Sequence, residues 1–174
     1  MIRRATGSDI PAIAAIYDAI HSREERGAGC TGWVRGIYPT ADTARAAIEA
    51  GDMYVETEGD TVVASARINR QQMPAYAEVA WRYPAPDDRV MVLHTLTVDP
   101  ECEGRGYARA FLAFYEACAR ENGCRVLRID TNARNVRARA MYAGYGYVES
   151  GIIPCEFNGI ADVRLVCMEK KLTP

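Results

Sequence analysis

Between a nearly continuous apolar run and a strongly amphipathic segment, the chain reads VDPECEGRGYA, from Val98 to Ala108. Gly104, Gly106 and the small Ala108 allow the backbone to approach a ligand closely with its N–H groups free. The helix that begins at this turn has unpaired N–H donors and about half a positive charge at its first turn. The turn therefore predicts an anion site suited to phosphate or pyrophosphate, although a plain strand-to-helix turn that uses glycine for positive φ fits the same residues.

The patterning on either side of this turn predicts one α/β domain over residues 1–174, with a mixed sheet. Residues 90–98 are apolar almost throughout, as a strand covered on both faces requires. No linker, repeat or low-complexity segment divides the sequence. The expected helices cover about 9–20, 41–50, 106–122 and 135–144, and the expected strands cover 2–4, 53–58, 61–69, 90–98, 125–130, 147–156 and 161–170.

Two of the helical patterns predict the faces that pack on the sheet. In the helix expected at 106–122, the core stripe consists of Tyr107, Phe111, Phe114 and Cys118. In the helix expected at 135–144, the packing stripe consists of Val136, Ala140 and Ala143.

Composition excludes several classes of protein. The 174 residues are 49% hydrophobic and carry a net charge of −2, so disorder is not the dominant state. The 21 basic and 23 acidic residues argue against a strongly basic nucleic-acid binder, and no run approaches the ~18 apolar residues of a membrane span. We therefore expect no nucleic-acid or membrane partner and a cytoplasmic location.

The cysteines and histidines argue against a metal centre. Six cysteines are scattered without a CxxC pair, and the chain has two histidines. We expect no metal cofactor, and thiols that are reduced.

A dinucleotide-binding turn is one alternative for the glycine motif. In such a turn GxGxxG follows the strand almost at once, whereas five residues separate Val98 from Gly104 here, and Arg109 stands where the third glycine belongs. Asp130 ends the next strand, where a ribose-binding acid can sit, but only 44 residues follow it. A nicotinamide-dependent oxidoreductase is therefore the weaker interpretation.

Two motifs in sequence resemble those of the GNAT superfamily of acyl-CoA N-acyltransferases. Residues 98–108 are similar to the coenzyme A loop of that family, V-x-P-x-x-Q/R-G-x-G-x-G/A, and residues 135–147 are similar to its second signature, N-x-x-A-x-x-x-Y-x-x-x-G-F/Y. The order of strands and helices agrees along nearly the whole chain. The resemblance implies a mixed, mostly antiparallel sheet flanked by helices, with a splayed central strand pair that forms the coenzyme A cleft.

The resemblance also implies roles for individual residues. Backbone groups of Leu96, Thr97 and Val98 would hold the pantetheine arm and the acetyl carbonyl at a bulge. Asn135 would bind the pantetheine or pyrophosphate region, and Tyr142 would protonate the departing thiolate. The main-chain N–H groups that would cradle the pyrophosphate belong to Glu103, Gly104, Arg105, Gly106, Tyr107 and Ala108.

Glu103 departs from the family pattern, which has Gln or Arg at this position. A carboxylate beside a pyrophosphate is electrostatically adverse unless it points away. We expect the side chain to turn toward solvent, with Arg105 or Arg109 offsetting its charge.

Helix geometry supports a shared site for Asn135 and Tyr142. The two residues are seven apart, so their side chains project within about 20° of each other, two turns along one face. Ala138 lies between them and is small enough to leave room for a ligand. Without a ligand, Asn135 is explained as a helix N-cap and Tyr142 as a core aromatic.

Transfer of an acetyl group to an amine requires an unprotonated amine, a stabilised carbonyl oxygen and a protonated leaving thiolate. A backbone N–H near Val98 can serve the oxygen, and Tyr142 can serve the thiolate. His94 is the candidate base, because an unperturbed imidazole has a pKa of about 6.5. Its surroundings are similar to the L-H-x-L-x-V strand of arylalkylamine N-acetyltransferases. Alternatively His94 shapes the acceptor pocket without proton transfer, and Glu78 is the reserve base.

Aromatic residues gather in two irregular segments that would border the acceptor pocket. Trp33 and Tyr38 lie in the first, and Trp81 lies in the second with Tyr76 and Tyr83. Such rings suit an apolar amine or a cation held against ring faces. The same rings also suit a role in covering the core beneath loops.

Together these features predict an acetyl-CoA-dependent N-acetyltransferase that acts on a small amine or an amino terminus by direct attack in a ternary complex. We expect a monomer or homodimer. The alternative from a different class is an acyl-CoA-binding module without turnover.

Overall fold

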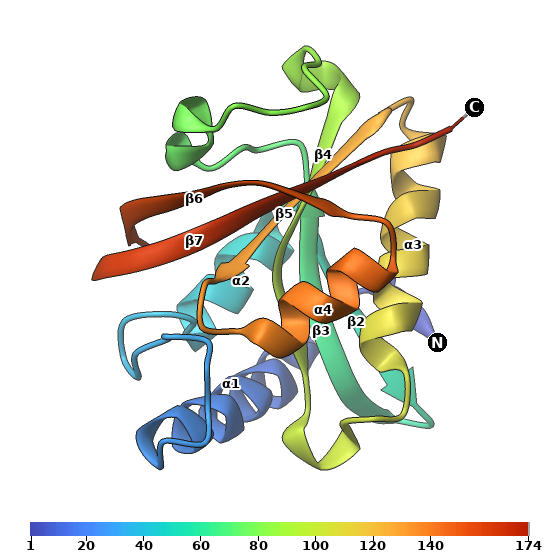
Figure 1. Ribbon diagram of the computed structural model, residues 1–174. Coiled ribbons are helices and arrows are strands. Elements are labelled where there is room, and N and C mark those ends of the chain that lie inside the picture. Colours follow the sequence, from blue (N-terminus) through green and yellow to red (C-terminus); the bar gives the residue numbers. More distant parts are fainter. Residues whose placement is uncertain (174) are drawn as a thin grey trace.

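In the computed structural model, which describes residues 1–173, seven strands form one sheet in the order β1-β2-β3-β4-β5-β7-β6 (Figure 1). The strands are β1 (Ile2–Arg4), β2 (Met53–Glu58), β3 (Thr61–Asn69), β4 (Val90–Val98), β5 (Val126–Asn132), β6 (Val148–Phe157) and β7 (Ile160–Lys171). The helices are α1 (Ile10–Glu25), α2 (Ala41–Glu49), α3 (Tyr107–Glu121) and α4 (Val136–Gly144), with short 3₁₀ turns η1 (Gly7–Asp9), η2 (Pro74–Glu78), η3 (Asp87–Arg89) and η4 (Pro100–Cys102).

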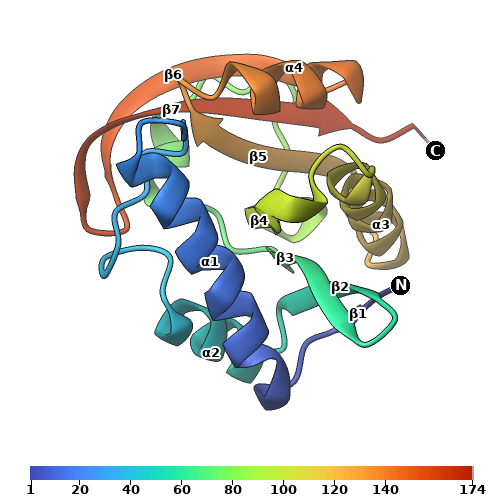
Figure 2. The same ribbon diagram turned by 90° about the horizontal axis from the view of Figure 1, so that it is seen from below.

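The sheet confirms the expected mostly antiparallel α/β fold. Among residues 1–173, β4 and β5 are the one parallel pair, and every other neighbouring pair is antiparallel. Figure 2 shows α1 and α2 on one side of the sheet and α3 on the other. A dinucleotide-binding domain requires a doubly wound parallel sheet, so this topology argues against the nicotinamide interpretation.

The central strands separate in the middle of the sheet. β4 pairs with β5 from Val90 to Leu93, and no pair joins them beyond Leu93 and Ile129. The remaining half of β4, from residue 94 to 98, therefore presents unpaired backbone groups toward β5. This is the splayed strand pair that the family resemblance implies.

A bulge in β4 accompanies the separation. Ser65 of β3 lies opposite Thr97, and Arg67 lies opposite His94, so one residue of β3 faces two of β4. Thr95 stands in this bulge with φ of 51°, which is uncommon for a β-branched residue. The bulge turns β4 away from β5 and opens a cleft between them.

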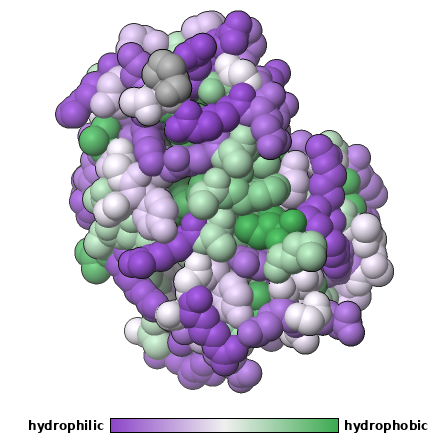
Figure 3. All heavy atoms as spheres, turned by 90° about the vertical axis from the view of Figure 1, so that its right-hand side faces the viewer, coloured by the Kyte–Doolittle hydropathy of each residue, from purple (hydrophilic) through white to green (hydrophobic). Residues whose placement is uncertain are grey.

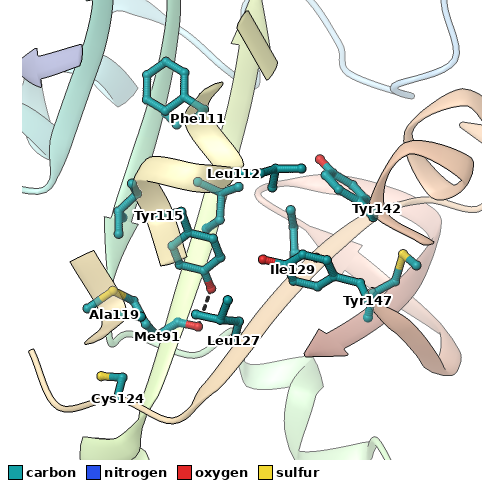
Figure 4. Packing of buried hydrophobic residues seen from close by; sticks show 14 of the residues in the cluster. Met91, Phe111, Leu112, Tyr115, Ala119, Cys124, Leu127, Ile129, Tyr142 and Tyr147 are labelled. Carbon is teal, nitrogen blue, oxygen red and sulfur yellow. Dashed lines mark hydrogen bonds between the residues drawn. The ribbon is translucent and has the colours of Figure 1, made fainter. Parts of the chain in front are cut away.

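Tyr115 of α3 ties the two strands together just before they part. Its hydroxyl lies 2.5 Å from the Met91 carbonyl and 3.0 Å from the Arg128 carbonyl, and it accepts a hydrogen bond from the Arg128 amide at 3.2 Å. The side chain is fully buried in the cluster drawn in Figure 4. The paired part of β4 and β5 is thus fixed to α3, and the separation begins from a rigid position.

The buried faces of α3 and α4 differ from the predicted stripes. The fully buried residues of α3 are Phe111, Leu112, Tyr115 and Ala119, whereas the rest of the predicted stripe is only half-buried. The apolar surface of α3 is wider than one stripe. Phe114 also packs on Tyr54 of β2, with 5.1 Å between the two ring centroids. Figure 3 shows hydrophobic side chains gathered in the middle of this side of the molecule, with hydrophilic ones around them.

In α4 the predicted stripe faces outward. Val136 is 68% exposed, and Ala140 and Ala143 are also exposed. The larger Met141 and Tyr142 take the sheet side instead, because they bury more apolar area than alanines do.

The Tyr115 contact generates a stability prediction. Tyr115→Phe should lower the free energy of unfolding by ~2 kcal/mol, because it leaves the buried Arg128 amide without its partner. Urea denaturation measures the change, with Tyr145→Phe as the control, since the Tyr145 hydroxyl has no hydrogen-bond partner in residues 1–173. Equal stability of the two variants would contradict a fixing role for the hydroxyl.

Candidate active site

The turn before α3 has its amides free. No amide from Glu103 to Ala108 donates a hydrogen bond to an acceptor in residues 1–173, and the first such bond at this helix end runs from Ala110 to the Gly106 carbonyl at 3.0 Å. Gly104 and Gly106 have φ of 80° and 92°, and a Cβ at either would meet open space. The positive φ angles, rather than a lack of space, therefore require glycine at these two positions. The turn also leaves consecutive backbone N–H groups free to bind a ligand.

The Glu103 side chain leaves this row of amides and bridges two helices. Its carboxylate lies 2.5 Å from an Arg23 nitrogen of α1 and 2.7 Å from an Arg137 nitrogen of α4. The expected partners Arg105 and Arg109 do not offset its charge, and Arg105 pairs instead with Glu58 at 3.3 Å. Sequence spacing cannot show that α1 and α4 both come close to this turn.

A cavity of about 160 Å³ lies between the separated strands and α4. Its walls include predicted site residues from both motifs and from the strand before the first one. These are Leu96, Val98, Ala108, Asn135, Ala138 and Tyr142. The other predicted backbone contributor, Thr97, is buried and bonds to the Ser65 hydroxyl at 2.8 Å. The structure thus brings the two sequence motifs to one cleft.

Tyr142 faces this cavity from α4. It is 6% exposed, and its hydroxyl forms no hydrogen bond with a described residue. In Figure 4 its hydroxyl points away from Tyr147, at the edge of the core cluster. Burial, with a smaller effect of Asp130, raises the pKa of Tyr142, so the phenol stays protonated at neutral pH and can donate a proton.

Asn135 performs the expected cap and also lines the cavity. Its Oδ1 accepts a hydrogen bond from the Ala138 amide at 3.0 Å at the beginning of α4. The amide nitrogen of the side chain has no partner in residues 1–173 and remains available to a ligand.

A second cavity of about 470 Å³ adjoins the first. It lies over the other side of β4, between η2 and α2, and His94 and Arg67 line it. The two cavities share four residues, which are Tyr38, Thr95, Asp130 and Phe157. A ligand in the second cavity can therefore meet one in the first at these residues.

His94 lies in the second cavity, where its Nε2 is 3.0 Å from the Asn69 Oδ1. Because that oxygen accepts, Nε2 carries the proton and Nδ1 is the unprotonated nitrogen. Burial, and then the charge of Arg67, lowers the pKa of His94 to about 4. The imidazole is therefore neutral at physiological pH and a weak base.

The predicted acceptor residues divide into two groups. Trp33 and Tyr38 line the smaller cavity, with Tyr38 packed edge-on against Trp33 and hydrogen-bonded to Thr95. Trp81 and the exposed Glu78 line neither cavity. Trp81 lies behind Tyr76, to whose carbonyl its indole N–H donates at 3.0 Å, and the Arg128 guanidinium lies 4.0 Å from its ring.

Sequence reasoning missed three residues of the site. Asp130 lines both cavities, and Thr95 forms the bulge between them. Glu24 shapes the segment before Trp33, since it accepts hydrogen bonds from the Thr31 and Gly32 amides at 3.0 Å each. Of these, Asp130 alone had a signal, because it follows the last apolar residue of its strand.

Two general features bear on the class of protein. No helix of residues 1–173 is long and apolar enough to cross a membrane. Within the same residues, no three His, Cys, Asp or Glu side chains are placed to share a metal ion.

The chain is similar to known acetyltransferases in both sequence and fold. The chain is 28% identical over 135 residues to an aminoglycoside N(6')-acetyltransferase type 1 from Stenotrophomonas maltophilia, covering 74% of this chain and 86% of that protein. A GNAT acetyltransferase from Streptococcus agalactiae superposes with a TM-score of 0.82 at 20% identity, covering 100% of this chain and 96% of that one.

An acetyltransferase-like chain from Salmonella typhimurium, described with its cofactor acetyl-CoA, superposes with a TM-score of 0.70 at 20% identity, covering 99% of this chain and 94% of that one. At this identity the superpositions establish the fold. Residues 16–147, which contain the amide turn, the bulge and α4, match the sequence model of an acetyltransferase family. The chain belongs to the acetyltransferase (GNAT) family.

Proposed function

We propose that this protein is an acetyl-CoA-dependent N-acetyltransferase that acts on the amine of a small molecule or an amino terminus. One observation carries the proposal: a single cleft joins the free amides at Ala108 to Tyr142 and then to a second, larger cavity. The cleft provides places for a diphosphate, a thioester and an acceptor in that order. Such an arrangement suits direct attack in a ternary complex.

The residues present fit acetyl-CoA, which supplies the activated acetyl group. The six amides from Glu103 to Ala108 would hold the pyrophosphate, since they point outward without protein partners. Unpaired backbone groups of Leu96, Thr97 and Val98 would hold the pantetheine arm and the acetyl carbonyl. The free amide nitrogen of Asn135 would bind the same arm.

Tyr142 would supply the proton that the leaving thiolate requires. When the acceptor nitrogen attacks the carbonyl carbon, a C–N bond forms and the C–S bond breaks. A backbone N–H beside the bulge would stabilise the oxygen as it becomes negative. The raised pKa of Tyr142 keeps its proton in place until the sulfur departs with its electron pair.

The acceptor is a separate question. The aminoglycoside relative suggests an amine on a polar small molecule as one class to test. The prediction that His94 removes the amine proton stays a prediction. Its pKa of about 4 favours the other role left open by the sequence, in which the ring shapes the acceptor cavity.

Replacement of Tyr142 tests the acid role and separates an enzyme from a binding module. Tyr142→Phe should lower kcat at least tenfold, because the thiolate loses its proton donor, and should keep the Kd for acetyl-CoA within twofold. Coenzyme A release with a panel of amines, amino acids, polyamines and aminoglycosides measures turnover, and calorimetry measures binding. Tyr145→Phe, directly after the same helix, is the control. Equal activity of the Tyr142 variant would remove it from the mechanism.

Replacement of Glu103 tests the position of the pyrophosphate. Glu103→Gln removes a negative charge beside the amides and releases Arg23 and Arg137, so acetyl-CoA should bind two- to fivefold tighter at low salt. The gain should shrink in 0.5 M salt, where charges are screened. Calorimetry measures both, with Glu101→Gln as the exposed control. Weaker binding would show instead that the bridge holds the turn in shape.

Replacement of His94 decides between its two roles. His94→Ala should lower kcat/KM by a similar factor at every pH from 6 to 9, because a group with a pKa of about 4 does not change charge there. A pH profile of coenzyme A release checks this. A loss concentrated at neutral pH and relieved at alkaline pH would support the base role.

A further inference from the structure

Asp130 occupies the point where the two cavities meet. It follows Ile129, the last residue of β5 that pairs with β4, so the separation of the strands uncovers it. The residue is partly buried and lines both cavities.

The carboxylate is half satisfied. Oδ2 accepts a hydrogen bond from the Tyr76 hydroxyl at 2.7 Å. Oδ1 accepts none from residues 1–173, and no cationic side chain among them forms an ion pair with Asp130. Carboxylates that are partly shielded from water usually have a charged partner, so an unpaired one where two cavities meet points to a ligand that brings the charge.

The groups around Asp130 leave its charge uncompensated. Arg67, the cation of the larger cavity, is 3.2 Å from Asp52 and is paired there. His94 is neutral at physiological pH. The titratable groups that face Asp130 from the other elements are all neutral in that range, namely Tyr38, Tyr76, Tyr142, Cys155 and Cys167.

The carboxylate is also held in place. Tyr76 is 2% exposed, and Trp81 packs edge-on against its ring at 5.1 Å between centroids. The Trp81 indole bonds to the Tyr76 carbonyl. Trp81 therefore acts on the site through Tyr76, which holds Oδ2 of Asp130 and leaves Oδ1 for the ligand.

We propose that Asp130 binds the ammonium group of the acceptor and takes its proton, so that the substrates are aliphatic primary amines without a carboxylate next to the nitrogen. The inference rests on the proposed acetyltransferase function. An aromatic amine is neutral and gains little from the carboxylate. A free amino acid would place its own carboxylate against Asp130 and be repelled.

The proposed reaction moves two protons and one acetyl group. The Asp130 carboxylate accepts one proton from the ammonium, and the freed nitrogen pair forms the C–N bond at the acetyl carbon. The C–S bond breaks, and the sulfur takes the proton of the Tyr142 hydroxyl. The second nitrogen proton restores Tyr142 through water, and Asp130 releases its proton to solvent. One ammonium and one thioester thus give one amide, one thiol and one proton.

Desolvation raises the pKa of Asp130 to about 6, against the lowering effect of the Tyr76 hydrogen bond. Asp130 is therefore ionised at pH 7.5, and activity should fall as pH drops through about 6. Removal of the Tyr76 hydroxyl should raise this pKa further. Tyr76→Phe should then move the acidic limb of kcat/KM to higher pH, which a merely structural role of Tyr76 would not do.

The experiment uses the full chain with acetyl-CoA and measures coenzyme A release. The acceptors are 1,4-diaminobutane, glucosamine, ethanolamine and an aminoglycoside, compared with aniline and glycine. The best aliphatic amine should exceed aniline and glycine at least 100-fold in kcat/KM. Asp130→Asn should lower that value at least 100-fold and keep the Kd for acetyl-CoA within twofold, while Asp162→Asn, an exposed carboxylate of β7, leaves both unchanged.

Folding of the variant is checked separately. A carboxyl group whose pKa is raised by folding makes the protein less stable once it is ionised. Asparagine carries no charge, so Asp130→Asn should unfold at the same or a higher temperature than the parent at pH 7.5.

The outcomes are distinguishable. Retention of activity within threefold in Asp130→Asn, equal use of aniline or glycine, or no turnover of any aliphatic amine by a protein that binds acetyl-CoA would each overturn the role of Asp130. Failure of the protein to bind acetyl-CoA would overturn the proposed function itself.

Discussion

The separation of β4 from β5 is the constraint on which the rest of the site depends. Two adjacent parallel strands normally satisfy each other's backbone groups along their whole length. Here the bulge at Thr95 ends that pairing after Leu93, while Tyr115 holds the paired half to α3. The cleft is therefore a break in the sheet with fixed edges, and backbone groups within it are left for a ligand.

Charge is distributed to match the two halves of this cleft. Donors without partners gather at the turn before α3, where an anion fits, and the Asp130 carboxylate, which has no ion pair with a described residue, lies at the opposite end beside Tyr76. Between them Tyr142 is neutral, and its hydroxyl forms no hydrogen bond with a described residue. The departure at Glu103 does not disturb this order, because Arg23 and Arg137 hold its carboxylate away from the amides.

The parts predicted from sequence are those that depend on local rules. Glycine conformation located the turn at Gly104 and Gly106, and a seven-residue spacing placed Asn135 and Tyr142 on one face of α4. The predicted packing face of α4 was wrong because it rested on Ala140 and Ala143, whose small size does not decide which side of a helix packs. Helix α1 continues beyond Ile20 to Glu25, and its last turn is polar and pairs with Arg35, so apolar spacing does not reveal where the helix ends. Asp130 lines the larger cavity because the register of β5 against β4 ends at the residue before it, and no short sequence motif encodes that register.

The hairpin of β6 and β7 brings Phe157 to both cavities from a tip of two residues, Asn158 and Gly159, whereas the amide turn lies on α3. In the proposed function, the hairpin tip that would contact the acceptor and the amides that would hold the nucleotide are thus about fifty residues apart in sequence. Insertions or replacements at that tip can diversify what is modified without rebuilding the donor half. The scaffold is in this sense modular, because the two halves of the cleft are built from separate segments of the chain.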